Sequence, residues 1–230
     1  MKNMQQQLDN LLHKYDIHAQ VCLENEGSAI VDGIRVPLLS HRSERRFIEL
    51  RNIVQGGTLS GVSVMRTARI IQRGSDLYKT LYRELDICEF VLGESICSIM
   101  VMNNDAALNA IARTNNGIVC TIEISATLSA GEPPKDKHEI ISQQGIACDV
   151  VVDAQLRQDS IYVFGDENTQ FTDVDFELYG LTAEDAAVIR YVFAVAKQQS
   201  ARQMCDQHQR LSVLVDMAIK SAASGYREEL

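Results

Sequence analysis

The apolar positions divide the first part of the chain into alternating helical and extended segments. Apolar side chains recur at helical spacing over residues 3–15 and over about 43–55, and an alternating run over 17–23 favours a strand. A Val- and Ile-rich run over 58–71 predicts a longer strand. The stretch Gly74-Ser75-Asp76 supplies an N-cap for a predicted helix that runs through Leu92 and ends at Gly93, because capping residues accept from free backbone N–H groups and Gly terminates helices.

Beyond Gly93 the pattern changes to short runs that are rich in β-branched residues and separated by turn residues. The pair Asn116-Gly117 between two such runs is typical of a hairpin. Consecutive strands with short turns predict an antiparallel or mixed sheet and not a doubly wound parallel sheet. The predicted strands cover residues 96–102, 107–113, 118–127, 138–142, 147–152, 161–164 and 171–176.

Two helices close the chain. Thr182 precedes an apolar face that includes Ile189 and Val192, and a last helix is expected from about 210 to 224 with Gly225 as its cap. The fold class is therefore α+β, a mostly antiparallel or mixed open-faced sheet with helices on one face. An open apolar sheet face normally finds a partner, so we expect a homo-oligomer, such as a dimer, built on that face.

Charge and composition exclude several classes of partner. The 22 Lys and Arg residues against 31 Asp and Glu residues give a formal charge of −9, which disfavours nucleic acid as a partner. The polar start, MKNMQQQ, is unlike a signal peptide, and no run of about 18 apolar residues occurs. We therefore expect a cytoplasmic protein with no membrane partner.

Motifs for cofactor and metal chemistry are missing from the sequence. No G-x-G-x-x-G, Walker A, H-E-x-x-H or G-x-S-x-G pattern occurs, and the five His residues are far apart along the chain. We therefore expect no cofactor and no metal site. His138, which leads a predicted strand after a Pro-rich loop, is interpreted as a surface or edge residue. The six Cys residues show no C-x-x-C spacing and are interpreted as reduced core residues.

Three stretches occur in an order that resembles the C-terminal half of the Gfo/Idh/MocA family of oxidoreductases. They are LRNIVQGGTLSGV at 50–62, ELDICEFVLGE at 84–94 and MAIKSAASG at 217–225. The resemblance implies a C-terminal domain like that of glyceraldehyde-3-phosphate dehydrogenase over 36–230, preceded over 1–35 by a helix–strand remnant of a Rossmann domain. It also implies that the glycine-rich loop and the E-K-P lysine motif of the family have no counterpart here, so that the NAD(P) site is lost.

The helix that lines the substrate cleft in this family departs from the pattern in this chain. Where the family tends to have Asp, then His four residues on, then Asp three residues further, this sequence has Lys79, Arg83 and Asp86. An arginine stays protonated and cannot shuttle a proton. Two interpretations remain open for these residues: a solvated helix face with an Arg83–Asp86 ion pair, or a pocket in which Lys79 and Arg83 bind a small anion or sugar acid.

Arg42 and Arg45 lie in a stretch that often reaches the substrate region in the family, and a plain basic helix face is the alternative. Three function classes follow. The first, which we favour, is a non-catalytic ligand-binding or oligomerisation module, a pseudoenzyme. The second is the substrate-binding subunit of an NAD(P)-dependent sugar or polyol oxidoreductase whose Rossmann domain is on a partner chain. The third is a structural oligomer that regulates a full-length relative.

Overall fold

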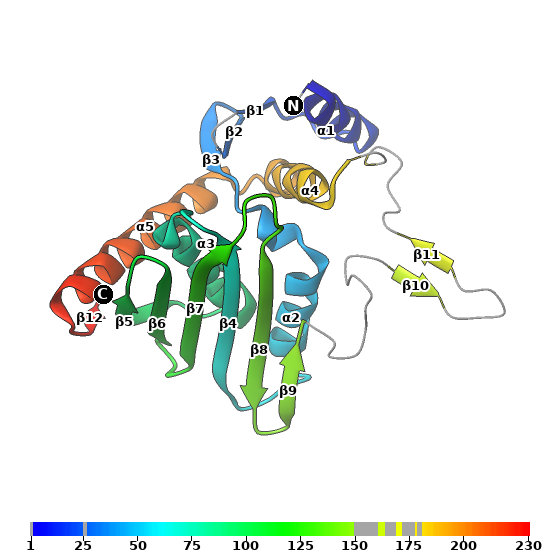
Figure 1. Cartoon of the computed structure of the whole chain (residues 1–230). Helices are drawn as coiled ribbons and strands as arrows, with labels where there is room; N and C mark the ends of the chain where they lie inside the picture. Colours follow the sequence, from blue (N-terminus) through cyan, green and yellow to red (C-terminus); the bar gives the residue numbers. More distant parts are fainter. Residues whose placement is uncertain (1, 25–26, 150–160, 164–168, 172–177, 179–180) are drawn as a thin grey trace. The chain divides into compact units, whose positions relative to one another are not determined.

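The computed structural model describes residues 2–24, 27–149, 161–163, 169–171, 178 and 181–230 (Figure 1). The chain divides into two compact units, and each is described by itself. Unit 1 consists of Met1–Arg46 and Ala154–Gln209, and unit 2 consists of Phe47–Asp153 and Arg210–Leu230. Within the described residues, no helix is long and apolar enough to cross a membrane.

The helices and strands follow the predicted order closely in unit 2. The helices are α1 (Lys2–Lys14), the 3-10 helix η1 (Ser40–Ser43), α2 (Arg45–Gln55), α3 (Leu77–Leu92), α4 (Ala183–Gln198) and α5 (Ala201–Ser224). The strands are β1 (Val21–Leu23), β2 (Ser28–Val31), β3 (Ile34–Pro37), β4 (Val62–Gln72), β5 (Ile96–Asn103), β6 (Ala107–Thr114), β7 (Val119–Leu128), β8 (Lys135–Ser142), β9 (Gly145–Cys148), β10 (Ile161–Val163), β11 (Thr169–Phe171) and β12 (Glu228–Glu229).

Unit 2 is built on a seven-stranded mixed sheet with the order β12-β5-β6-β7-β4-β8-β9. β4 and β7 pair in parallel, and every other neighbouring pair is antiparallel. The parallel pair arises because the chain leaves β4 through α3 and returns through the β5-β6-β7 meander. The predicted α+β class with a mixed sheet is confirmed.

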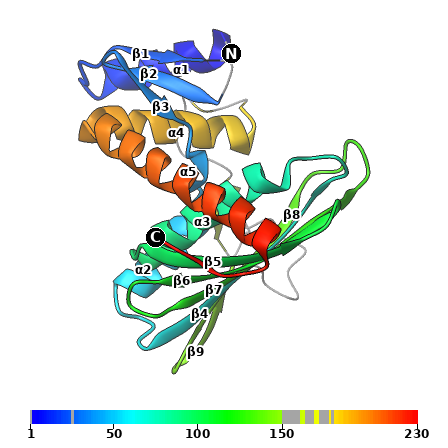
Figure 2. The same cartoon turned by 90° about the vertical axis from the view of Figure 1, so that its left-hand side faces the viewer.

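Among the described residues, one face of this sheet is covered and the other is open. Side chains alternate along β6, where Leu108 and Ala110 are buried and Asn109 and Ile111 are exposed. Figure 2 shows α3 and the C-terminal half of α5 along the covered face. The helices therefore pack on one face, as the sequence predicts.

Helix α3 carries the residues on which the functional prediction depends, and its ends form as predicted. Asp76 accepts hydrogen bonds from the backbone N–H groups of Tyr78 (2.8 Å) and Lys79 (3.1 Å). Gly93 adopts φ +70°, and its N–H donates to the carbonyl of Glu89. An Asp cap of this kind stabilises a helix by about 1 kcal/mol, so the start of α3 is fixed next to the end of β4.

Unit 1 contains strands that the sequence analysis did not predict. β1 lies within the predicted strand 17–23, whereas β2 and β3 were not predicted, and the three strands form an antiparallel sheet in addition to α1 and α4. β2 and β3 are joined by Asp32 and Gly33, both at positive φ (49° and 79°), which is the Asp-Gly turn of a two-residue hairpin. The prediction was incomplete here, although the Asp-Gly pair was a readable signal.

Two more differences concern the C-terminal third. Helix α5 begins at Ala201 and not at about residue 210. The sequence analysis placed the start too late because the first turns are mostly polar, although Ala201 and Met204 are buried there. β9, β10 and β11 fall within or next to predicted strands, whereas the predicted strand residues 150–152, 164 and 172–176 lie outside the described residues.

Candidate functional site

The three predicted residues of α3 lie in different environments. Lys79 is exposed, the Arg83 side chain is 18% exposed, and Asp86 is completely buried. The interpretation as a solvated helix face is therefore wrong for Arg83 and Asp86. The first turn of the helix is exposed to solvent and its later turns are in the core. Lys79, Arg83 and Asp86 therefore differ in exposure although they lie on one face of the helix.

Arg42 and Arg45 belong to unit 1 and are described within it. Arg45 is exposed and Arg42 is half-buried, with its Nη1 donating to the sulfur of Met204 at 3.8 Å. The contact with Met204 packs the Arg42 guanidinium against the polarizable thioether of α5.

A row of alternating charges crosses the covered side of the unit 2 sheet. The Nη1 atoms of Arg69 and Arg83 lie 2.5 Å and 3.6 Å from Asp136 Oδ2, and Arg83 Nη1 also lies 2.5 Å from Glu84 Oε1. The other oxygen of Glu84 lies 3.0 Å from His138 Nε2. This row therefore links β4, α3 and β8.

His138 is enclosed completely. Its Nδ1 lies 2.6 Å from Asp149 Oδ2, its backbone N–H donates to Asp149 Oδ1 at 2.7 Å, and the Asp149 N–H donates back to the His138 carbonyl at 3.1 Å. The ring of Phe47 meets the imidazole edge-on, with ring centroids 4.7 Å apart. The prediction of a surface or edge residue was wrong, because β8 is an inner strand between β4 and β9 and His138 points to the covered face.

The two central ionisable groups hold opposite charges. Burial alone lowers the pKa of His138, but its hydrogen bonds to Asp149 and Glu84 outweigh burial and raise the pKa to about 9. Burial alone raises the pKa of Glu84, but the hydrogen bond from His138 and the positive charge of Arg83 lower it to about 2. At neutral pH the site therefore contains an imidazolium between carboxylates.

This charge state limits the chemistry of the cluster. An imidazolium has no lone pair with which to accept a proton, and the guanidinium of Arg83 does not release one. In the form described, neither His138 nor Arg83 can act as a general base at neutral pH. The arrangement is that of an electrostatic core that joins the sheet to α3.

The sheet also creates a set of possible metal ligands that the sequence analysis missed. One ligand atom each from Asp136, His138 and Asp149 lies within 4.8 Å of the others, and His138 and Asp149 are buried. The group could not be seen in the sequence because Asp149 is distant from Asp136 and His138 along the chain. The pairing of β9 with β8 brings Asp149 next to them. The usable signal was the alternation Asp136-x-His138, which places both side chains on one face of a strand, but the predicted strand began only at residue 138 and left Asp136 out.

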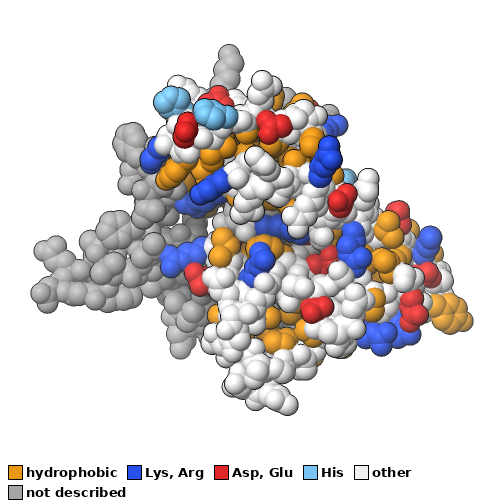
Figure 3. All heavy atoms as spheres, turned by 180° about the vertical axis from the view of Figure 1, so that it is seen from behind, with side chains coloured by type: hydrophobic (Ala, Val, Ile, Leu, Met, Phe, Trp, Pro, Cys, Tyr) orange, Lys and Arg blue, Asp and Glu red, His pale blue; other side chains and the backbone are white. Residues whose placement is uncertain are grey.

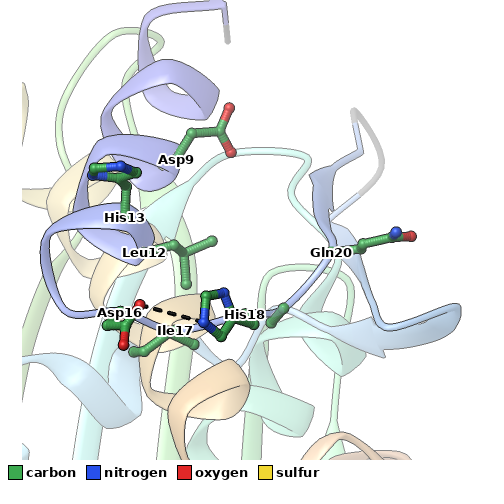
Figure 4. Close-up of a pocket in the computed structure, with 8 residues that line it drawn as sticks. Asp9, Leu12, His13, Asp16, Ile17, His18 and Gln20 are labelled. Carbon is green, nitrogen blue, oxygen red and sulfur yellow. Dashed lines mark ion pairs between the residues drawn. The ribbon is translucent and has the colours of Figure 1, made fainter.

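A second group of acidic and histidine side chains lines a hollow of about 630 Å³ at the end of α1. Figure 3 shows histidines and acidic side chains gathered on the surface over this helix. In Figure 4, His18 faces Asp16 (3.3 Å), whereas Asp9 and His13 project from α1 above the apolar side chain of Leu12. Asp16 and His18 are each 89% exposed, so these residues are an open surface group without a fixed geometry.

The cysteines divide into buried and accessible thiols. All six are free, and only Cys88 and Cys120 are fully buried, whereas Cys22 is exposed. The hydrogen bond between the Cys88 thiol and Cys120, together with burial, raises the pKa of Cys88 well above its usual value. The interpretation as core residues is therefore right for this pair and wrong for Cys22.

The fold was compared with known proteins. No family model matches the sequence, and no curated protein matches it. Solved structures do match: a myo-inositol dehydrogenase from Corynebacterium glutamicum (TM-score 0.59, 15% identity), scyllo-inositol dehydrogenase from Lactobacillus casei with NAD(H) and scyllo-inositol (0.58, 10%), and myo-inositol 2-dehydrogenase from Lactobacillus plantarum (0.58, 13%).

The match covers most of this chain and part of each relative. The alignments include 84%, 83% and 84% of this chain and 63% of each of the three solved chains, in the order given above. The chain thus spans less than two-thirds of the length of the dehydrogenases that it matches. The structural similarity confirms the fold that the resemblance implied: this chain has the fold of the C-terminal α+β domain of Gfo/Idh/MocA-type dehydrogenases.

Proposed function

We propose that this chain is a cytoplasmic, non-catalytic module of a dehydrogenase-like fold that binds a ligand or assembles into an oligomer. The observation that carries the proposal is Arg83. It stands where the family resemblance implies a proton-transfer histidine, and its guanidinium is held by Glu84 and Asp136. A cation fixed in this way keeps a structural role but cannot replace the acid–base function of a histidine. The free thiols of all six cysteines support a reducing compartment.

The open sheet face supports the assembly part of the proposal. Met100 and Ile111 are cross-strand partners that are 37% and 50% exposed, and Met102 nearby is 70% exposed. Further along the same face Arg66 lies 3.8 Å from Glu123 and 3.5 Å from Glu139. Apolar side chains beside charges of both signs suit a self-complementary two-fold contact with a second copy of the chain.

Light scattering at micromolar concentration tests the assembly part. We expect twice the mass of one chain, whereas the mass of a single chain would overturn it. The purified chain should also form no NAD(P)H from inositols or other polyols when NAD(P)+ is added. Turnover by the chain alone would contradict the non-catalytic assignment.

Among the three candidate residues on α3, Lys79 is the one whose side chain is exposed to solvent. Its ammonium group lies at the first turn of α3 and is reachable by an anion, whereas Arg83 is held by carboxylates. A sugar acid bound there should lose affinity in Lys79→Ala. The exposed Lys197→Ala, in unit 1, is the matched control. Equal calorimetric affinities in both variants would exclude Lys79 as a contact.

The second candidate function is the substrate-binding subunit of an NAD(P)-dependent sugar or polyol oxidoreductase. It is supported by the L. casei relative, whose structure contains NAD(H) and scyllo-inositol. In this case a separate chain would provide the nucleotide-binding domain. NAD(P)-dependent polyol oxidation that arises only on mixing the two chains would favour this function over the first.

A further inference from the structure

Asp136, His138 and Asp149 present two carboxylates and one imidazole to a common point in unit 2, with ligand atoms no more than 4.8 Å apart. Asp149 and His138 are 5% and 0% exposed, and the Asp136 side chain is 11% exposed. Imidazole and carboxylate are the ligands that Zn²⁺ and similar first-row divalent ions take in proteins. We propose that these three residues bind one divalent transition-metal ion, with His138 Nδ1 as the nitrogen ligand.

A buried hydroxyl without a hydrogen-bond partner lies beside the cluster and supports the same proposal. Thr67 is 1% exposed, and its Oγ1 has no hydrogen-bond partner. Thr67 lies directly opposite His138 in the β4–β8 pairing, so the two side chains stand next to each other on the covered face. A buried hydroxyl without a partner is destabilising, and a metal-bound water, or the metal itself, would satisfy this one.

The surrounding groups are those that orient metal ligands. Glu84 accepts from Nε2 of His138 at 3.0 Å, which leaves Nδ1 on the side of the two aspartates. A carboxylate behind a ligating histidine fixes the ring and increases its basicity. Arg69 donates to Oδ2 of Asp136 and so orients this carboxylate. The site therefore has outer contacts for both a nitrogen and an oxygen ligand.

Charge and distance both permit the ion. Among the groups named here, the carboxylates of Asp136, Asp149 and Glu84 and the guanidiniums of Arg69 and Arg83 sum to one negative charge, which either a proton or a metal ion on His138 offsets. A proton on His138 gives a net charge of zero, and a divalent ion in place of the Nδ1 proton gives a net charge of +1. Tetrahedral ligands of Zn²⁺ lie roughly 3.4 Å apart. The three ligand atoms here lie within 4.8 Å of one another, and His138 Nδ1 and Asp149 Oδ2, now 2.6 Å apart, would separate to admit the ion.

The ion would have a structural role that is independent of the proposed function. It would join β8 to the residue that follows β9 and, through Glu84, to α3. Because no hydride transfer or ligand binding enters this argument, failure of the metal site would leave the proposed function untouched, and the reverse also holds.

Titration of the chelator-treated full chain with Zn²⁺ tests the proposal, with Co²⁺ absorption as a second readout. We expect one ion per chain, a higher unfolding temperature, and visible Co²⁺ bands typical of a four-coordinate site. Asp149→Asn should weaken Zn²⁺ binding by more than about 100-fold, because even outer contacts are worth 10–100-fold. The control variants His13→Ala and His18→Ala should leave binding unchanged, since both residues are on the surface of unit 1.

Thr67→Val keeps the shape of the side chain and removes only the hydroxyl, so it provides a test if Asp149→Asn fails to fold. It should change the Co²⁺ spectrum and weaken binding about 10-fold. The proposal is overturned if the chain binds no Zn²⁺, or if Thr67→Val and Asp149→Asn bind like the unchanged chain. It is also overturned if binding disappears in His13→Ala or His18→Ala.

Discussion

Replacing Glu84 by Gln should destabilise unit 2 more than any change to an exposed carboxylate. Glu84 is completely buried between the imidazolium of His138 and the guanidinium of Arg83. Gln keeps the size of the side chain and can still hydrogen-bond, but it removes the negative charge that both cations face. The substitution therefore isolates the electrostatic part of the interaction.

Two routes give the same magnitude. Removing one partner of a buried ion pair costs about 3–5 kcal/mol. The pKa of Glu84 falls from 4.5 to about 2 in the folded chain, and at 1.36 kcal/mol per pKa unit this corresponds to about 3 kcal/mol. We expect Glu84→Gln to lower the free energy of unfolding by about 3 kcal/mol. This is a large fraction of the roughly 5–15 kcal/mol typical of a domain.

Urea unfolding at neutral pH with a metal chelator present measures the effect. Glu123→Gln is the matched control, because Glu123 is half-exposed on the open sheet face and pairs with Arg66 only at 3.8 Å. The double variant Glu84→Gln, His138→Gln should recover part of the loss, because it removes the imidazolium that Glu84→Gln leaves unbalanced. A cost below about 1 kcal/mol for Glu84→Gln, or no coupling with His138→Gln, would refute this reasoning.

Three further predictions concern stability. With chelator present, the free energy of unfolding should be highest between pH 4.5 and 6.5. Below this range Glu84 becomes protonated as the pH falls toward its lowered pKa of about 2, and above it His138 loses its proton as the pH rises through its raised pKa of about 9, so the ion pair is lost on both sides. A flat profile in urea titrations would contradict this. Asp76→Ala should cost about 1 kcal/mol by removing the cap of α3, whereas Asp105→Ala, at an exposed turn, should change little. Gly93→Ala should cost at least about 1 kcal/mol, because φ is +70° and a Cβ would lie 2.8 Å from the Gln55 amide; thermal unfolding equal to that of the unchanged chain would show that the loop relaxes.

The unit 2 fold was predictable because local signals and periodicity agree there. Alternation along β5, β6 and β7, the cap at Asp76 and the stop at Gly93 all indicate the element that forms. The Asn116-Gly117 pair likewise marks the β6–β7 hairpin, where Gly117 has φ +90°. Unit 1 was predicted less well, since β1, β2 and β3 have only three or four residues each and show little periodicity.

The site was predicted only in part because its geometry depends on strand register. Arg83 was identified from its place in the family pattern, but Glu84, the next residue along the helix, was overlooked. The partners of Arg83 and Glu84, Asp136 and His138, are more than 50 residues away in sequence. Nothing local in the sequence states that β8 lies between β4 and β9, and this placement buries His138.

The measurement that tests the central claim most directly is sedimentation equilibrium of the chain beside the variant Ile111→Lys at micromolar concentration. Ile111 lies on β6 at the open sheet face and is 50% exposed. The control is Val213→Lys, because Val213 on α5 is 48% exposed. If the open face is the assembly surface, the unchanged chain and Val213→Lys sediment as dimers and Ile111→Lys as a monomer. Three monomers, or a dimer that Ile111→Lys leaves intact, would contradict the claim.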